Sequence, residues 1–225
     1  MKLLVAIKSC MRDRARGAHD AIRNTWGARV QGADVIFFVG SSPLNVFLED
    51  DEDSLPVADD YDSLPFKTRE ILRQSVSRGY DFTFLCDNDT FIIPNRLMST
   101  GFEEYDYSGK FNLRTRGSRS QPGRRFHYVD DRGTYPDIYC WCSGGFGYFV
   151  SRRAAELVVA SEPKVWAEDM YVGQVLGPHI QRGELTAAHL GDLASEISWH
   201  YPNHHSLQAY DPSSGWQQEM SERYK

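Results

Sequence analysis

The chain has 225 residues, of which 41% are hydrophobic, and its formal net charge is −6. This length allows one sizeable core and requires no second domain. The acidic balance argues against a protein that binds nucleic acids or membranes with its whole surface.

The start of the chain and its cysteines bear on the cellular compartment. No charged-then-apolar leader precedes the first apolar run, and no apolar stretch of about 20 residues follows it. We therefore expect a cytoplasmic protein of bacterial, phage or viral origin, or a chain from which a membrane anchor was removed. The cysteines lack zinc-finger spacing, so we expect reduced thiols at Cys10, Cys86, Cys140 and Cys142.

The first forty residues predict a strand, a helix and a second strand. Residues 3–7 are a short apolar run between polar residues, which indicates a central strand. Residues 14–26 predict a helix that ends at Gly27, and residues 34–40 predict a second buried strand. This order is typical of a parallel sheet with a right-handed crossover.

The next segment adds a helix and a strand. An acidic linker at residues 49–62 precedes a helix that begins near Pro65 and ends at Gly79. Lys67 is expected on the inner side of that helix. Residues 81–93 then predict a buried strand that is interrupted by three polar residues.

These polar residues are Asp87, Asn88 and Asp89, and they are the centre of the functional prediction. Two carboxylates one residue apart at the end of a strand suit a hard divalent cation, because Mg²⁺ and Mn²⁺ prefer oxygen ligands. In open α/β sheets, ligands bind at the carboxyl ends of the strands. A polar turn between two strands is the alternative for an isolated Asp-x-Asp sequence.

The second half of the chain continues the alternation of strands and helices. Residues 105–113 predict a strand, and residues 114–133 lack periodicity and predict a long basic surface loop. Residues 144–150 predict another strand, after which Ser151 is the expected N-cap of a helix at residues 152–160.

The last predicted helix completes the alternation of strands and helices from which the fold class is predicted. Glu168 and Asp169 suit the first turn of a helix, because acidic residues there favour the helix dipole. From residue 211 onward we expect a polar tail with at most one short helix. The chain is thus predicted to be an α/β protein with a single Rossmann-like domain over residues 1–210 and a tail at residues 211–225. Its central sheet should be mixed, mainly parallel and flanked by helices.

Five blocks of sequence are informative in their order and spacing. They are Ile22-Arg23-Asn24-Thr25-Trp26-Gly27; Asp59, Tyr61, Leu64, Lys67 and Thr68; Asp87-Asn88-Asp89; Ser143-Gly144-Gly145-Phe146-Gly147-Tyr148 with Ser151; and Glu168-Asp169-Met170-Tyr171-Val172-Gly173. A sixth, weaker block is Ile197-Ser198-Trp199-His200-Tyr201. With these blocks the chain resembles, over roughly residues 3–201, the galactosyltransferase and fringe-type family of β-1,3-glycosyltransferases, including its core-1 synthase branch.

The resemblance implies a GT-A type fold, a nucleotide-sugar donor such as a UDP-sugar, a divalent metal and inversion at the anomeric carbon. By the same likeness Asp89 and His200 hold the metal, while Asp87 contacts the ribose or reaches the metal through water. Because an imidazole ligand suits a softer ion than magnesium, we expect Mn²⁺, with Mg²⁺ as the alternative. Asp169 is the expected catalytic base. Helix capping by Glu168 and Asp169 and a surface role for His200 are the structural alternatives.

The other expected site residues divide between donor and acceptor. The expected donor-binding residues are Ser9, Arg14, Arg23, Lys67, Asp87 and Asn88. The expected acceptor-binding residues are Trp141, Gly144, Gly145 and Glu168. Packing without ligand contact is the alternative for Arg23 and Trp141.

Departures from the family leave the acceptor and the compartment open. The usual membrane anchor and lumenal disulfides are missing, and Asn88 stands where the family commonly has Asp. One acceptor is the hydroxyl of a glycan or glycoconjugate. The other is a hydroxylated base in DNA, as in phage-type DNA modification, because a basic tract with Phe126, His127 and Tyr128 interleaved could hold a phosphate backbone. The basic residues of this tract are Lys110, Arg114, Arg116, Arg119, Arg124, Arg125 and Arg132. A catalytically silent sugar-nucleotide or glycan-binding module is the third hypothesis.

Overall fold

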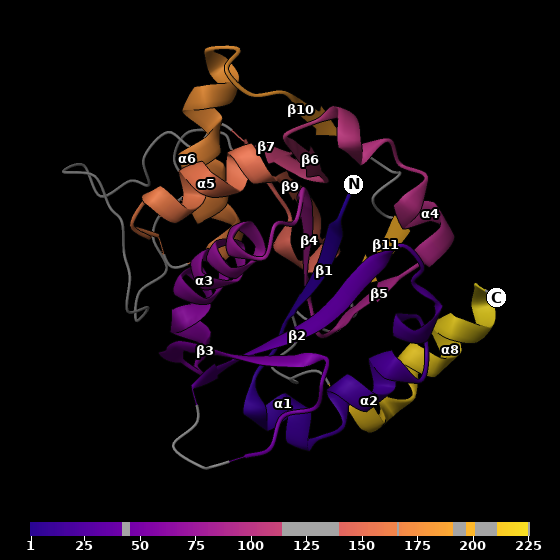
Figure 1. Cartoon of the computed structure of the whole chain (residues 1–225). Helices are drawn as coiled ribbons and strands as arrows, with labels where there is room; N and C mark the ends of the chain where they lie inside the picture. Colours follow the sequence, from indigo (N-terminus) through magenta and orange to yellow (C-terminus); the bar gives the residue numbers. More distant parts are fainter. Residues whose placement is uncertain (42–45, 114–139, 166, 191–196, 201–210, 225) are drawn as a thin grey trace.

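A seven-stranded sheet lies between two layers of helices (Figure 1). The computed structural model describes residues 1–41, 46–113, 140–165, 167–190, 197–200 and 211–224. The strand order in the sheet is β10-β6-β9-β4-β1-β2-β3. The strands are β1 (Leu3–Lys8), β2 (Ala33–Ser41), β3 (Glu52–Ala58), β4 (Phe82–Asp87), β6 (Tyr107–Gly109), β9 (Tyr148–Ser151) and β10 (Ala187–His189).

The sheet is mainly parallel, as predicted. Strands β1, β2, β3 and β4 pair in parallel, and β10 pairs in parallel with β6. Only β9 runs against its two neighbours, β4 and β6. Two short antiparallel ribbons accompany the sheet: β5 (Thr90–Ile92) with β11 (Ser198–His200), and β7 (Phe111–Leu113) with β8 (Cys140–Cys142). The predicted α/β fold class is confirmed.

Helices cover both faces of the sheet (Figure 1). The helices are α1 (Met11–Ala15), α2 (Ala18–Arg23), α3 (Leu64–Ser77), α4 (Pro94–Met98), α5 (Arg152–Ala160), α6 (Glu168–Gln181) and α8 (Trp216–Arg223). On one face α3, α5 and α6 pack over a first hydrophobic cluster, and on the other α2, α4 and α8 contribute to a second. None of these helices is long and apolar enough to cross a membrane.

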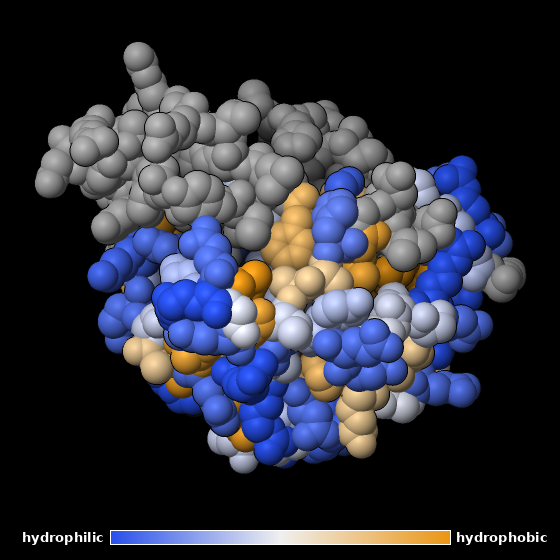
Figure 2. Space-filling model, turned by 90° about the horizontal axis from the view of Figure 1, so that it is seen from above, coloured by the Kyte–Doolittle hydropathy of each residue, from blue (hydrophilic) through white to orange (hydrophobic). Residues whose placement is uncertain are grey.

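Strand β1 separates the two clusters and explains why its sequence is continuously apolar. Leu4 and Ala6 point into the first cluster, whereas Leu3, Val5 and Ile7 point into the second. A strand buried on both faces needs apolar residues at every position, unlike a half-exposed strand. In Figure 2 hydrophilic residues cover much of the coloured part of the face, and hydrophobic residues gather near its middle. The core side chains themselves are buried in the two clusters.

The single helix predicted at residues 14–26 was wrong. The segment forms two short helices, α1 and α2, because Gly17 between them adopts a left-handed conformation with φ of 87°. Glycine reaches this region without the steric cost that a Cβ atom adds. A short 3₁₀ turn at Gly27–Arg29 then ends the unit.

Two other segments differ from the prediction. Residues 49–62, expected as a linker, contain the edge strand β3, in which polar residues and Pro56 are tolerated because one side of an edge strand is unpaired. The strand predicted at residues 105–113 is divided into β6 and β7, which belong to different sheets. The basic loop at residues 114–133 lies outside the described residues.

The segment predicted as a polar tail carries helix α8, which packs on the domain. Met220 and Gln217 are buried, and Trp216 and Tyr224 contact the ring of Phe91. Among the described cysteines, Cys86 is buried and Cys10 is half-buried, both with free thiols, and Cys142 is buried.

Candidate active site

The candidate site lies where β1 and β4 end side by side. The parallel register of these strands sets Lys8 opposite Asp87, so the chain leaves β1 through Ser9 next to the turn Asp87-Asn88-Asp89. Parallel strands direct their carboxyl ends to the same edge of the sheet, which is where α/β proteins bind ligands. The predicted location of the Asp-x-Asp turn agrees with this arrangement.

Lys8 is the electrostatic centre of this edge. Its side chain is buried, its Nζ lies 3.0 Å from Asp87 Oδ1, and it also contacts Glu168 Oε1. Burial alone would lower the pKa of Lys8, but the two carboxylates outweigh burial and raise its pKa above the ordinary value. A permanently charged ammonium therefore joins the Asp-x-Asp turn to the first residue of α6.

Glu168 is fixed on three sides. Besides Lys8, the hydroxyl of Tyr148 donates to Oε2 at 2.6 Å, and the hydroxyl of Thr68 lies 3.3 Å from the same oxygen. Glu168 is only 6% exposed, so these partners supply the hydrogen bonds that water would otherwise make to its carboxylate. This geometry favours a positioning role for Glu168 over the predicted acceptor contact.

Asp169, the next residue, is half-buried and differs from Glu168 in its partners. Its Oδ2 accepts from the backbone N–H of Gly144 at 3.2 Å, and its Oδ1 accepts from the N–H of Met170 at 2.7 Å. Burial, followed by the negative charge of Glu168, raises the pKa of Asp169 to about 7. A carboxylate with that pKa can both take and release a proton near neutral pH.

Gly144 allows the approach that these contacts require. A Cβ atom at this position would lie 2.3 Å from Glu168 Oε1 and 3.5 Å from Asp169 Cβ. Gly145 follows it and offers its carbonyl to the hydroxyl of Thr90 at 3.0 Å. The structure therefore brings Gly144, Gly145, Glu168 and Asp169 together, as the sequence predicted.

Asn88, the middle residue of the turn, is held by the end of β1. Its Nδ2 donates to Ser9 Oγ at 3.0 Å and to Asp13 Oδ2 at 3.2 Å. Ser9 Oγ also lies 2.8 Å from Nε2 of the buried His19, whose Nδ1 lies 2.6 Å from Glu52 Oε1. Burial lowers the pKa of His19, so the ring is neutral at neutral pH. Ser9 and Asn88 thus form part of a positioning network.

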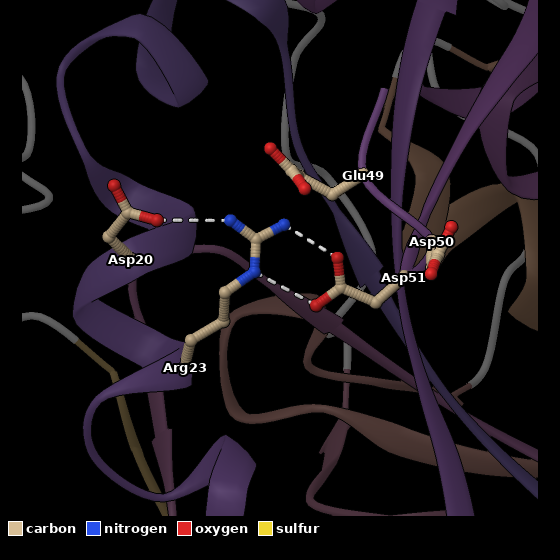
Figure 3. A pocket seen from close by; sticks show the side chains of 5 residues that line it. All are labelled: Asp20, Arg23, Glu49, Asp50 and Asp51. Atoms are coloured by element: carbon tan, nitrogen blue, oxygen red, sulfur yellow. Dashed lines mark hydrogen bonds and ion pairs between the residues drawn. The ribbon is translucent and has the colours of Figure 1, made fainter. Parts of the chain in front are cut away.

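Three cations expected at the donor are paired with carboxylates. Lys67 donates to Asp59 Oδ1 at 2.9 Å and to the carbonyl of Ser9, and Arg14 donates to Glu52 at 2.8 Å. Arg23 pairs with Asp20, Asp51 and Glu52. Figure 3 shows Arg23 in a pocket lined by Asp20, Glu49, Asp50 and Asp51, which does not include the Asp-x-Asp turn.

The backbones of the three residues expected to hold the metal lie near one another. Asp89 is 8% exposed, the side chain of Asp87 is 27% exposed, and His200 pairs with Thr90 across the β5–β11 ribbon, one residue beyond Asp89. The structure describes the backbone of His200 but not its side chain. In the described ranges, no group of three His, Cys, Asp or Glu residues is arranged to hold a metal. Carboxylate oxygens such as those of Asp87 and Asp89 are of the type that Mn²⁺ and Mg²⁺ take as ligands, with phosphate and water as further ligands.

Trp141 lies on β8, half-buried, and packs against the first hydrophobic cluster. This contact supports the core alternative for that residue. The sequence interpretation missed Lys8, His19, Glu52, Tyr148 and Thr90 as members of the site. Of these residues, only Lys8 could have been found from the sequence. It is a cation at the end of a strand predicted to be buried, and a buried lysine needs a charged partner.

Comparison with known proteins identifies the family. A family model described as galactosyltransferase matches residues 17–181, most of the chain. No curated protein matches the chain significantly. The matched family contains β-1,3-galactosyltransferase and fringe-type enzymes, so the family resemblance is confirmed. The chain therefore belongs to the galactosyltransferase family and is a glycosyltransferase.

Proposed function

We propose that the chain is a metal-dependent inverting glycosyltransferase that transfers a sugar from a UDP-sugar to a hydroxyl of a saccharide or glycoconjugate. One observation carries this proposal: the buried Lys8 pairs with Asp87 and with Glu168 and so joins the Asp-x-Asp turn to the helix that presents Asp169. This connection supports a cation site at the turn and a proton acceptor at Asp169, both along one edge of the sheet.

Asp169 is proposed as the general base. Inverting transfer needs a carboxylate that removes the proton of the acceptor hydroxyl without forming a bond to the sugar. With a pKa of about 7, Asp169 is a stronger base than an ordinary aspartate, and the N–H of Gly144 keeps one of its oxygens oriented. Its proton leaves for solvent after transfer.

A metal is proposed because the neighbouring cations are already engaged. Lys8, Lys67 and Arg14 each contact a carboxylate among the described residues. The negative charge of a diphosphate therefore requires an additional cation, which Asp89 and His200 would hold, with Asp87 close by. When bound, Mn²⁺ would act as a Lewis acid that stabilises the charge developing on the departing diphosphate.

The donor is proposed to lie over the ends of β1 and β4. Ser9 and Asn88 border this place, but both side chains make internal hydrogen bonds. We therefore propose that they shape the nucleotide site and hold the turn. The acceptor would enter beside Gly144, whose N–H bonds to Asp169, and Gly145, because glycines allow a close approach to the backbone. The β-1,3 linkage is proposed from the family resemblance.

The acceptor is best tested with saccharides first. The alternative acceptor, a hydroxylated base in DNA, depends on basic residues at positions 114–132 that lie outside the described ranges, so no contact in the structure supports it. Transfer to DNA that weakens steeply with added salt and disappears when three of these arginines become alanine would favour it.

A panel of UDP-sugars tests the proposal directly. Each sugar is incubated with the chain, Mn²⁺ and a set of saccharide acceptors, and the anomeric configuration of any product is read by NMR. The proposal expects metal-dependent product with an inverted configuration. Retention at the anomeric carbon, or transfer that is unaffected by chelators, contradicts it. Donor binding without turnover in any acceptor set supports the silent binding module instead.

A further inference from the structure

Thr90, the residue after the Asp-x-Asp turn, makes contacts with both halves of the site. It is completely buried, and its hydroxyl accepts from the backbone N–H of Asp87 at 3.3 Å and donates to the carbonyl of Gly145 at 3.0 Å. The residue before Gly145, Gly144, donates to Asp169. One hydroxyl group therefore lies between the turn proposed to bind the metal and the loop that orients the proposed base.

The backbone of Thr90 is fixed as firmly as its side chain. Its carbonyl accepts from Trp26 Nε1 and from Gln217 Nε2, both at 3.2 Å. Trp26 follows α2 and Gln217 belongs to α8, so residues from both ends of the chain hold the same carbonyl. These contacts fix the position of the Thr90 hydroxyl, which in turn helps to hold its two partners, the N–H of Asp87 and the carbonyl of Gly145.

The ribbon of β5 and β11 makes a second contact with the same loop. Ser198 on β11 donates to the carbonyl of Phe146 at 2.5 Å, next to the carbonyl of Gly145 that Thr90 holds. Two consecutive carbonyls of the Gly144–Phe146 turn are thus bound by neighbouring strands of one ribbon. That ribbon also carries His200, opposite Thr90.

From these contacts we propose that Thr90 is a positioning residue that couples the Asp87–Asp89 turn to the Gly144–Gly145 segment, so that ordering of one orders the other. The inference rests on the proposed roles of Asp89 as metal ligand and Asp169 as base. Thr90 itself does not touch substrate. Its hydroxyl is suited to this role because it donates its one proton to the carbonyl of Gly145 and accepts from the N–H of Asp87 through a lone pair.

Three variants of the full chain separate coupling from simple packing. Thr90→Val removes the hydroxyl and keeps a side chain of similar shape. Thr90→Ser restores the hydroxyl. The matched control is Thr83→Val on β4, the preceding strand in the sequence. It removes a buried hydroxyl that bonds only to Ser75 among the described contacts, at 2.5 Å.

Hydrogen-exchange mass spectrometry of metal-free protein provides the first measurement. We expect Thr90→Val to speed exchange on the order of tenfold in both residues 85–92 and residues 143–149, since each segment loses a buried hydrogen bond. Thr90→Ser should exchange like the parent chain, and Thr83→Val should leave residues 143–149 unchanged. Unchanged exchange of residues 143–149 in Thr90→Val overturns the proposal.

A second measurement uses the parent chain alone, so it can be made even if a variant fails to fold. Added Mn²⁺ with UDP should slow exchange in residues 143–149 as well as in residues 85–92, and slowing confined to residues 85–92 contradicts the coupling. By calorimetry, Thr90→Val should bind Mn²⁺ more weakly, on the order of 10-fold to 100-fold. A parent chain that binds no Mn²⁺ refutes the metal of the proposed function, whereas the metal-free exchange comparison still decides the coupling.

Discussion

The ammonium of Lys8 lies 3.0 Å from the carboxylate of Asp87, a residue 79 positions later in the sequence, and it contacts Glu168 as well. Two carboxylates from different elements therefore share one buried cation. Removing the cation leaves Glu168 without its charge partner in a place that water hardly reaches. The arrangement makes this lysine essential to the geometry of the site.

Replacement of Lys8 should be costly for stability. We expect Lys8→Met to lower the free energy of unfolding by about 3–5 kcal/mol, because it breaks a buried ion pair from one side. Urea unfolding followed by circular dichroism measures the change. Lys2→Met is the control, since Lys2 is half-exposed and its nitrogen lies 3.7 Å from Asp34, a surface pair worth less than about 1 kcal/mol. Equal losses in the two variants would refute the buried role of Lys8.

The rate of transfer should depend on pH through Asp169. Because only the ionised carboxylate accepts a proton, kcat/KM should rise with pH and level off above about 7, the pKa of this group. Asp169→Asn should abolish transfer and still bind the UDP-sugar. A value of kcat/KM that stays constant between pH 5 and 8 contradicts the assignment of Asp169 as the base, and so does an active Asp169→Asn variant.

The same group should impose a pH dependence on stability. The folded-state pKa of Asp169 is raised from an ordinary 3.8 to about 7, so the folded state keeps a proton that the unfolded chain has released. Its contribution to stability is therefore greatest at low pH and is lost as pH rises from about 4 to 7. Relative to the parent chain, Asp169→Asn should gain stability across this range, measured by thermal unfolding at several pH values. A constant difference between the two proteins would exclude the shift.

Gly144 should not tolerate a side chain. In Gly144→Ala the new methyl group would meet Glu168 Oε1 at 2.3 Å, and that oxygen cannot move freely because Lys8 holds it. We expect about 1–3 kcal/mol of destabilisation and a large loss of activity. Gly177→Ala is the matched control: it lies in α6, and apart from its chain neighbours and the helix backbone no atom lies within 4 Å of the added Cβ, so activity should be kept. Alanine favours a helix by about 0.5–1 kcal/mol, but Pro178 opposes this gain because it disfavours the helical conformation of a preceding residue that has a Cβ atom. Similar activity of the two variants would contradict the tight fit at Gly144.

Much of the fold could be predicted from local pattern. The apolar runs of β1, β2 and β4, the cap at Ser151 and the acidic opening of α6 each carry their signal within a few residues. Strand β3 could not be recognised from the sequence, because an edge strand can be polar and its local sequence then lacks an apolar pattern. Its pairing with β2 identifies it as a strand.

From the sequence, candidate site residues could be named only where they match the family pattern. Lys8, His19 and Thr90 act through partners far away in the sequence, so their roles depend on the register of β1 with β4 and on the positions of α2 and η4 (Gly144–Phe146). Helix α8 is polar on average and lacks a strong apolar stripe, yet Gln217 reaches Thr90. Only tertiary structure reveals such contacts.

The most direct test of the account is the position of Mn²⁺ in a crystal of the full chain grown with Mn²⁺ and UDP, located by its anomalous scattering. The account predicts one ion bound by the carboxylate of Asp89, the imidazole of His200 and the diphosphate, on the side of the sheet where Asp169 lies. An ion found instead in the pocket lined by Asp20, Glu49, Asp50 and Asp51, with no density at Asp89, would contradict it.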